Sequence, residues 1–368
     1  MSTASSQHTF TLICLVSKRF LHLARSRLYS RPFPASLTAD WSTASALLAS
    51  LVKRRGYLGT LVRSLNGLIS YIGRLSRYPL GSFRDVPAIF VWYIAILQAC
   101  PNIIELDLTF NNRDRLAQIL QVLRRPNPNL CSVHFANPYR GGRQAMSTTE
   151  QLAQTALQDP LFRSIEKLSL QSLERADSDP PSYPPLDLRL KSLSINESCR
   201  VIPRPCPVSL VDASALTHFD LVISDYSIES LSLYLTPLPS TLEHIVVNIV
   251  RYHETPHISS YAARSSEEIR LPIDTFSPFP YLRSLTLRHF PGPTLSLLRQ
   301  IVKSCTGLVK IDLTGCVWIL DNLNTADGEI WEDYCHAVFP FVEIYRELIA
   351  LQSLSCVHLG NVPAEDQI

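Results

Sequence analysis

The 368-residue sequence lacks several features that would assign it to a familiar class of protein. An excess of one charge is missing, since 34 lysine and arginine residues face 32 aspartate and glutamate residues and the net charge is +2. A dedicated nucleic-acid binder carries a strongly basic surface, so we expect no nucleic-acid partner. The chain also contains no Gly-x-x-x-x-Gly-Lys phosphate loop and no Gly-x-Ser-x-Gly nucleophile turn.

Paired cysteines and export signals are missing as well. The nine cysteines are odd in number and include no Cys-x-x-Cys pair, which favours a reducing cytoplasmic or nuclear setting. Residues 1–6 lack the basic and apolar regions of a secretory signal. The most apolar stretch, 86–104, is just long enough to cross a bilayer, but Gln98, Pro101 and Asn102 interrupt its end. We expect it to form a buried helix, with no membrane partner.

What the chain does contain is a recurring Leu-x-x-Leu-x-Leu pattern of aliphatic residues. Five of the eight intervals between successive segments are 25 to 27 residues. Leucine-rich repeats have periods of roughly 20–29 residues. The nine segments open at Ile103, Leu130, Ile165, Leu190, Leu216, Leu242, Leu282, Leu308 and Leu351.

The physics of one segment requires its neighbours. The last two apolar positions alternate with polar ones, as a short strand with one buried face requires. Three buried aliphatic side chains contribute roughly 1.5–3 kcal/mol each, whereas ordering about 26 residues costs on the order of 1.5 kcal/mol per residue. A single repeat therefore cannot fold alone. The sequence predicts an α/β leucine-rich-repeat solenoid with parallel strands on the concave side and helices or extended turns on the convex side.

The segments between the strands fit this second layer. Apolar residues at helical spacing predict helices over 112–125, 148–157 and 294–304, and a further helix over 329–348. The prolines of 178–185 and 203–207 forbid long helices, so extended turns are expected in the middle repeats. Residues 96–108 also align without gaps on 301–313, which places Cys100 and Cys305 at equivalent positions where buried thiols act as small apolar residues.

These patterns divide the chain into four expected parts. Residues 1–33 form a short helical segment, and residues 34–98 form a helical linker and an N-terminal cap. The solenoid occupies residues 99–360, and residues 361–368 form a tail.

The N-terminal segment carries a family resemblance. Residues 11–29 read Thr-Leu-Ile-Cys-Leu-Val-Ser-Lys-Arg-Phe-Leu-His-Leu-Ala-Arg-Ser-Arg-Leu-Tyr. This resembles the second half of an F-box, in which Leu-Val-Ser/Cys-Lys/Arg-Arg-Phe is followed by Leu-Ala and Leu-Tyr/Phe. Residues 63–65 are similar to the Val-Arg-Ser-Leu strand that often opens the repeats of such proteins. Residues 1–8 do not contain the Leu-Pro-x-Glu helix that begins an F-box. A truncated F-box, a degenerate F-box and a simple capping helix are therefore three open alternatives.

The resemblance implies a function and a partner. F-box proteins bind a Skp-type adaptor of a cullin ubiquitin ligase (an SCF complex) through the F-box helices, and their repeats hold a protein substrate. They belong to the ubiquitin-like conjugation pathway and catalyse no reaction themselves. The residues that would form the F-box core or contact the adaptor are Leu12, Leu15, Val16 and Phe20. The alternative is a leucine-rich protein-interaction scaffold without a link to a ligase.

Substrate binding is expected on the concave side of the strands, because the polar positions beside each central apolar residue point out of the sheet there. Serine and threonine are frequent at these positions, and the charges are of both signs, which suits a protein ligand. The ionisable candidates are Glu105, Asp107, His134, Lys167, His218, Asp220, Lys310 and Asp312.

One sequence suggests metal chemistry, but its context does not. His253-Glu254-Thr255-Pro256-His257 spells the His-Glu-x-x-His signature of zinc proteases. That chemistry requires both histidines one turn apart on a helix. Pro256 disrupts such a helix, and the preceding residues 242–250 favour a strand. We therefore expect an exposed loop, with no catalytic site, no metal and no cofactor.

Overall fold

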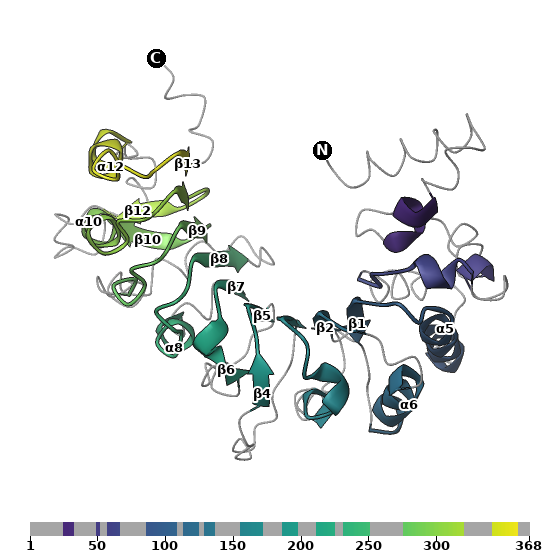
Figure 1. Cartoon of the computed structure of the whole chain (residues 1–368). Coiled ribbons are helices and arrows are strands. Elements are labelled where there is room, and N and C mark those ends of the chain that lie inside the picture. The colour runs from purple at the N-terminus through teal and green to yellow at the C-terminus, as the bar shows by residue number, and fades with distance from the viewer. Residues whose placement is uncertain are drawn as a thin grey trace, which may run out of the picture. The chain divides into compact units, whose positions relative to one another are not determined.

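In the computed structural model (Figure 1), the chain divides into two compact units, Met1–Pro181 and Ser182–Ile368. The described stretches are 25–32, 49–51, 57–66, 86–108, 113–124, 129–136, 155–171, 186–197, 211–224, 231–250, 275–319 and 341–359.

The first unit contains three parallel strands in chain order, β1-β2-β3. Figure 1 shows the two longer helices of the unit on the same side of β1. The elements are η1 (Gly59–Leu61), α5 (Val86–Ala99), β1 (Glu105–Leu108), α6 (Arg113–Arg124), β2 (Ser132–Ala136), η3 (Pro160–Phe162) and β3 (Lys167–Gln171).

The second unit continues the same alternation with six parallel strands, β5-β7-β8-β9-β11-β13. Its helices α8, α10 and α12 lie on one side of these strands (Figure 1). The elements are β4 (Leu186–Arg189), β5 (Ser192–Glu197), β6 (Val211–Asp212), η5 (Ala213–Ala215), β7 (His218–Ser224), α8 (Leu231–Leu235), β8 (His244–Val250), β9 (Ser284–Arg288), β10 (Pro291–Thr294), α10 (Leu295–Ser304), β11 (Lys310–Asp312), β12 (Val317–Ile319), α12 (Phe341–Leu348) and β13 (Cys356–His358).

The sequence periodicity predicted two helices closely. The helix expected over 112–125 is α6, which buries Leu116, Ile119 and Leu123. The helix expected over 294–304 is α10, which buries Leu298 and Ile301. Of the helices expected over 148–157 and 329–348, the described parts are residues 155–157 and α12, and both are helical.

Short extended pieces replace helices in parts of the second layer. β4 pairs with β6 in parallel, and β10 pairs with β12 in parallel, outside the main set of strands. β4 comes directly before β5, where a helix would otherwise precede the strand. This confirms extended structure in the middle repeats, although the proline stretches 178–185 and 203–207 lie outside the described residues.

One backbone hydrogen-bond pattern recurs at the start of nearly every strand. Two successive N–H groups donate to a single carbonyl that lies just before the preceding strand, at 2.8 to 3.2 Å. Cys131 and Ser132, for example, both donate to the Ile104 carbonyl. The accepting residue in most repeats directly follows the first apolar residue of the segment. The pattern fixes each strand in register with its neighbour and shows that the predicted triplets stack in parallel. The accepting residues in this part of the chain are Ile104, Cys131, Lys191, Thr217, Glu243, Arg283 and Val309.

The same pattern begins before residue 99. Ile104 and Glu105 donate to the Arg63 carbonyl, and Ser64 forms a parallel bridge with Glu105. Arg63 and Ser64 in turn donate to the Ser30 carbonyl, both at 2.9 Å. Residues 30 and 63–65 therefore take part in the parallel hydrogen bonding of the first unit, which agrees with the similarity of residues 63–65 to a strand that opens the repeats.

The ninth segment was predicted in the wrong register. In the structure β11 pairs with β13 so that Ile311 lies opposite Val357, which makes Leu354, not Leu351, the first residue of the triplet. Ser355 and Cys356 both donate to the Val309 carbonyl, as the repeating pattern requires for a segment that opens at Leu354. Leu351 instead lies three residues before the segment, as Cys305 lies three residues before Leu308, and the carbonyl of each accepts a hydrogen bond from the N–H of the segment's first residue.

The core of each unit consists of the aliphatic residues of the triplets and the inner faces of the helices. The eight segments from Ile103 to Leu313 have all three of their apolar residues buried. Cys100 and Cys305 have no exposed surface, which confirms their equivalent places at the ends of α5 and α10. Burial raises the pKa of the Cys100 thiol to about 12 and that of Cys305 to about 11, so both behave as apolar groups.

Several sequence predictions lie outside the described residues. They include Leu12, Leu15, Val16 and Phe20 of the F-box-like segment and His253, Glu254 and His257 of the protease-like signature. The stretch 86–104 contains α5, and no helix among the described residues is long and apolar enough to cross a membrane.

Candidate functional site

The candidate binding site of the second unit is the polar face of its strands. Because side chains alternate along a strand, the residues between the buried ones point to the opposite face. The pairing register arranges them in three rows, which together we call the second-unit face. The first row is Ser192, His218, His244, Ser284, Lys310 and Cys356; the second is Ser194, Asp220, Val246, Thr286, Asp312 and His358; the third is Asn196, Val222, Asn248 and Arg288.

The matching face of the first unit carries four of the predicted residues. Glu105 forms an ion pair with Arg31 at 3.0 Å. His134 Nδ1 lies 2.6 Å from the Ser169 hydroxyl on β3. Lys167 is exposed, whereas Asp107 is only 4% exposed. The sequence therefore placed these residues on one face, but Asp107 is not offered to solvent.

Two histidines stack in the first row of the second-unit face. The rings of His218 on β7 and His244 on β8 have centroids 4.2 Å apart and are inclined by 18°. The register places the two residues directly opposite each other, so the stack follows from parallel pairing. Thr217 holds the His218 ring through a 2.8 Å contact between its hydroxyl and Nδ1. The pair offers imidazole nitrogens at the surface, since His218 is exposed and His244 is half-buried.

Asp220 lies beside His218 on β7 and is half-buried. Burial raises the pKa of the Asp220 carboxyl above its ordinary value of 3.8, and the hydrogen bond from the Ser194 hydroxyl at 3.4 Å offsets only part of this effect. The ionised form of Asp220 is therefore less stable, relative to the protonated form, than it is in an exposed aspartate.

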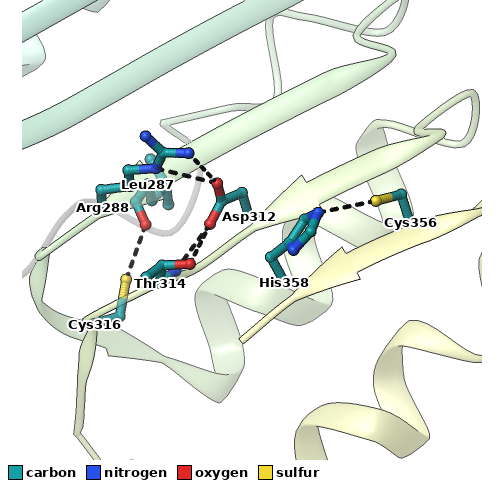
Figure 2. Close-up of polar contacts among 7 residues, drawn as sticks. All are labelled: Leu287, Arg288, Asp312, Thr314, Cys316, Cys356 and His358. Carbon is teal, nitrogen blue, oxygen red and sulfur yellow. Dashed lines mark hydrogen bonds and ion pairs between the residues drawn. The ribbon is translucent and has the colours of Figure 1, made fainter. Parts of the chain in front are cut away.

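Asp312 is held by a network of donors (Figure 2). Arg288 donates to Asp312 Oδ2 from Nε at 3.1 Å and from a terminal nitrogen at 2.8 Å. The Thr314 hydroxyl and backbone N–H donate to Oδ1 at 2.6 and 3.1 Å. Burial acts to raise the pKa of Asp312, but the bonds from Thr314 and Arg288 and the charge of Arg288 outweigh it and lower that pKa. The carboxylate is 3% exposed and its oxygens already accept four bonds.

A cysteine and a histidine meet on the last described strand. On β13, Cys356 Sγ lies 3.1 Å from His358 Nε2, as Figure 2 shows. The two residues stand two apart on one strand and therefore share a face. Among the described residues no group of three or more His, Cys, Asp or Glu side chains could hold a metal ion.

Three basic residues of the second-unit face are not among the residues that the sequence predicted. His244 is on β8, where the second outward position is the apolar Val246. The strand therefore lacks the two polar outward positions that mark the other segments. Arg288 lies in the third row, directly after the last residue of its Leu-x-x-Leu-x-Leu segment. His358 was hidden by the register error in the ninth segment. Extending each strand by two residues would reveal Arg288, and comparing both leucines of the ninth segment would reveal His358, whereas His244 requires only that a single polar position be accepted.

Two amide side chains on this face each have one buried oxygen atom that accepts no hydrogen bond. In the described part of the chain, the Oδ1 atoms of Asn196 and Asn248 have negligible exposed surface and accept no bond. Val222 lies between them in the third row. An unsatisfied buried amide destabilises a fold by about 1–3 kcal/mol.

Comparison with family models yields no match to this chain, and comparison with the sequences of curated proteins yields none either.

Proposed function

We propose that this protein is the substrate-recognition subunit of an SCF-type cullin ubiquitin ligase, with the leucine-rich repeats as its binding module. In this proposal the polar strand faces bind a protein substrate, and the F-box-like segment binds a Skp-type adaptor. The protein catalyses no bond formation or cleavage itself. It acts in the cytoplasm or the nucleus.

The observation that carries the binding part is the recurring register of the strands. Each strand contributes one side chain to each of the first two rows, and β5, β7, β8 and β9 also contribute to the third, so the second-unit face is a set of adjacent donors, acceptors and small apolar groups on a regular frame. A rigid frame of this kind suits recognition of another protein, because binding energy is not spent on ordering the site.

The adaptor part depends on the sequence resemblance of residues 11–29. One structural finding bears on it. The Ser30 carbonyl accepts hydrogen bonds from Arg63 and Ser64, so the end of the F-box-like segment is joined to the first repeat. This direct joining also suits the second candidate, a repeat scaffold whose N-terminal helix serves as a cap and has no link to a ligase.

Co-expression of the full chain with a Skp-type adaptor separates the two candidates. We expect the adaptor to co-purify at an equimolar ratio, and we expect Val16→Glu to abolish this by placing a charge in the apolar stripe of the F-box-like segment. Lys303→Glu on α10, which changes the charge of an exposed residue far from that segment in sequence, is the matched control and should retain the adaptor. Absence of the adaptor from the unsubstituted chain at stoichiometric levels would leave the scaffold as the function.

A further inference from the structure

The acidic residues of the second-unit face are withdrawn from its surface. Asp312 is nearly fully buried, and Arg288 and Thr314 occupy both of its oxygens. Asp220 is half-buried and accepts a hydrogen bond from Ser194. A ligand that approaches the face therefore meets little negative charge, although the sequence shows acids and bases in mixture.

The basic residues of the same face remain accessible. Arg288 keeps 49% of its side chain exposed while it binds Asp312. His218 and His358 are exposed, and His244 and Lys310 are half-buried. Glu243 lies next to this face at the start of β8, and its carboxylate pairs with Arg283 at 3.9 Å. Among the described residues of β7, β8, β9, β11 and β13, the side chains that can donate a hydrogen bond thus outnumber the carboxylates that are not already hydrogen-bonded or ion-paired.

An apolar spot lies on the same face as these donors. Val246 stands in the second row between Asp220 and Thr286, and Val222 stands in the third row of the neighbouring strand. Both valines are half-buried, so part of each is open to a ligand. Side chains on adjacent strands at such diagonal positions lie within reach of one aliphatic group.

We propose that the second-unit face binds an acidic segment of a partner protein, in which Asp or Glu side chains flank an aliphatic residue. This inference depends on the proposed recognition function and adds the class of substrate. Carboxylates of the segment accept hydrogen bonds from His218, His244 and Lys310, and the aliphatic side chain rests on Val222 and Val246. Charge complementarity of this kind gives an interface its specificity more than its affinity.

A peptide fits this face better than a nucleic acid does. Nucleic-acid surfaces gather many lysines and arginines, because affinity comes from neutralising successive phosphates. The second-unit face has one lysine and one arginine in its rows, and the arginine already binds Asp312. Imidazoles, hydroxyls, amides, two valines, a thiol and the two withdrawn aspartates make up the rest, and the imidazoles and hydroxyls are groups that recognise individual side chains.

A selection from a random displayed-peptide library tests the proposal with the full chain as bait. Three variants accompany it. Lys310→Glu replaces the one lysine of the face with an acid, Ser284→Trp blocks the face without changing its charge, and Lys303→Glu on α10 makes the same charge change outside the face. Thermal unfolding of each variant checks that it is folded. A fluorescent peptide of the enriched sequence, the same peptide with lysine for its acidic residues, and an oligothymidylate are then compared by anisotropy.

We expect the selected peptides to be rich in Asp or Glu around a Leu, Ile or Val. Lys310→Glu should weaken binding of the fluorescent peptide about tenfold, Ser284→Trp should abolish it, and Lys303→Glu should leave it unchanged. If the selected peptides are neutral or basic and Ser284→Trp abolishes their binding, the face still recognises peptides but the proposal of an acidic ligand is wrong. Stronger binding of the oligothymidylate would overturn the peptide class. Peptides indifferent to Ser284→Trp, or no enrichment at all, would overturn both the inference and recognition by this face.

Discussion

At the scale of single residues, Asp220 and Asp312 carry the same charge in the sequence but respond in opposite ways to folding. Asp220 is half-buried with one weak donor, and its pKa is raised. Asp312 is buried with four donated bonds, and its pKa is lowered. The difference arises from Arg288 and Thr314, each of which directly follows the last apolar residue of a Leu-x-x-Leu-x-Leu segment and so is not part of the repeating pattern.

Replacing these two aspartates should therefore change stability in opposite directions. A raised pKa means that the ionised Asp220 opposes folding above its unfolded value near 3.8, so Asp220→Asn should increase the free energy of unfolding at pH 7. The gain should fade as the pH falls toward that value, because the carboxyl is then protonated in both states.

For Asp312 the sign is reversed. Its lowered pKa stabilises the fold above the unfolded value and is lost as the pH falls through the folded value, so Asp312→Asn should reduce stability at pH 7 by about 1–3 kcal/mol. Urea unfolding at several pH values measures both effects. Equal signs for the two variants at pH 7 would contradict the account of their surroundings.

Two glycines form a second matched pair. A Cβ on Gly59 would lie 1.9 Å from the Ala99 carbonyl oxygen at the end of α5, whereas a Cβ on Gly307 would meet no atom within 4 Å. We expect Gly59→Ala to lower the thermal midpoint clearly and Gly307→Ala to leave it unchanged or raise it, since alanine restricts the unfolded chain by roughly 0.4–1 kcal/mol. Scanning calorimetry compares them, and a loss of similar size in both would refute the close approach at Gly59.

At the scale of elements, the sequence predicted what periodicity controls. The bounds of α6 and α10 differ from the expected ranges by one residue, because apolar residues at helical spacing leave little choice of face. The ninth strand was misplaced because Leu351 and Leu354 each begin an acceptable triplet. Only the hydrogen bonds to Val309 distinguish them, and a sequence pattern does not contain these.

The inner face of α10 should carry much of the packing energy of the second unit. Ile301 is buried, so Ile301→Ala should reduce the free energy of unfolding by about 2–5 kcal/mol. Lys303→Ala, two residues away and exposed, should change it by less than about 0.5 kcal/mol. Chemical denaturation provides both values, and a small loss for Ile301→Ala would show that α10 does not cover the core as described.

At the scale of the whole molecule, the sequence predicted which residues share the candidate face, but it did not predict which of them are exposed. Alternation along the strands placed His218, Asp220, Lys310 and Asp312 on one side, as the register confirms. Which of them meet solvent depends on contacts between repeats, such as the salt bridge from Arg288. Because such contacts bury or pair the carboxylates, the side chains that stay exposed on the face are mainly hydrogen-bond donors.

The two proposed binding activities should be separable by substitution. Val16→Glu should abolish adaptor binding and leave peptide selection unchanged, and Lys310→Glu should do the reverse, because the two residues belong to different parts of the chain. Co-purification and anisotropy on the same preparations measure both. A loss of both activities in either variant, with the fold intact, would contradict separate sites.

The central claim is that the aliphatic triplets stack as parallel strands in one common register, and a single disulfide tests it. Lys310 lies opposite the native Cys356, and adjacent strands are about 4.8 Å apart, within the Cα separation of roughly 4.4–6.8 Å that a disulfide spans. Mild oxidation of Lys310→Cys should therefore link residues 310 and 356, as mass spectrometry of non-reduced peptides would show, whereas Lys303→Cys should form no link to Cys356. A failure of the 310–356 link, together with a link in the variant that combines Lys310→Cys with Ser353→Cys, would contradict the common register.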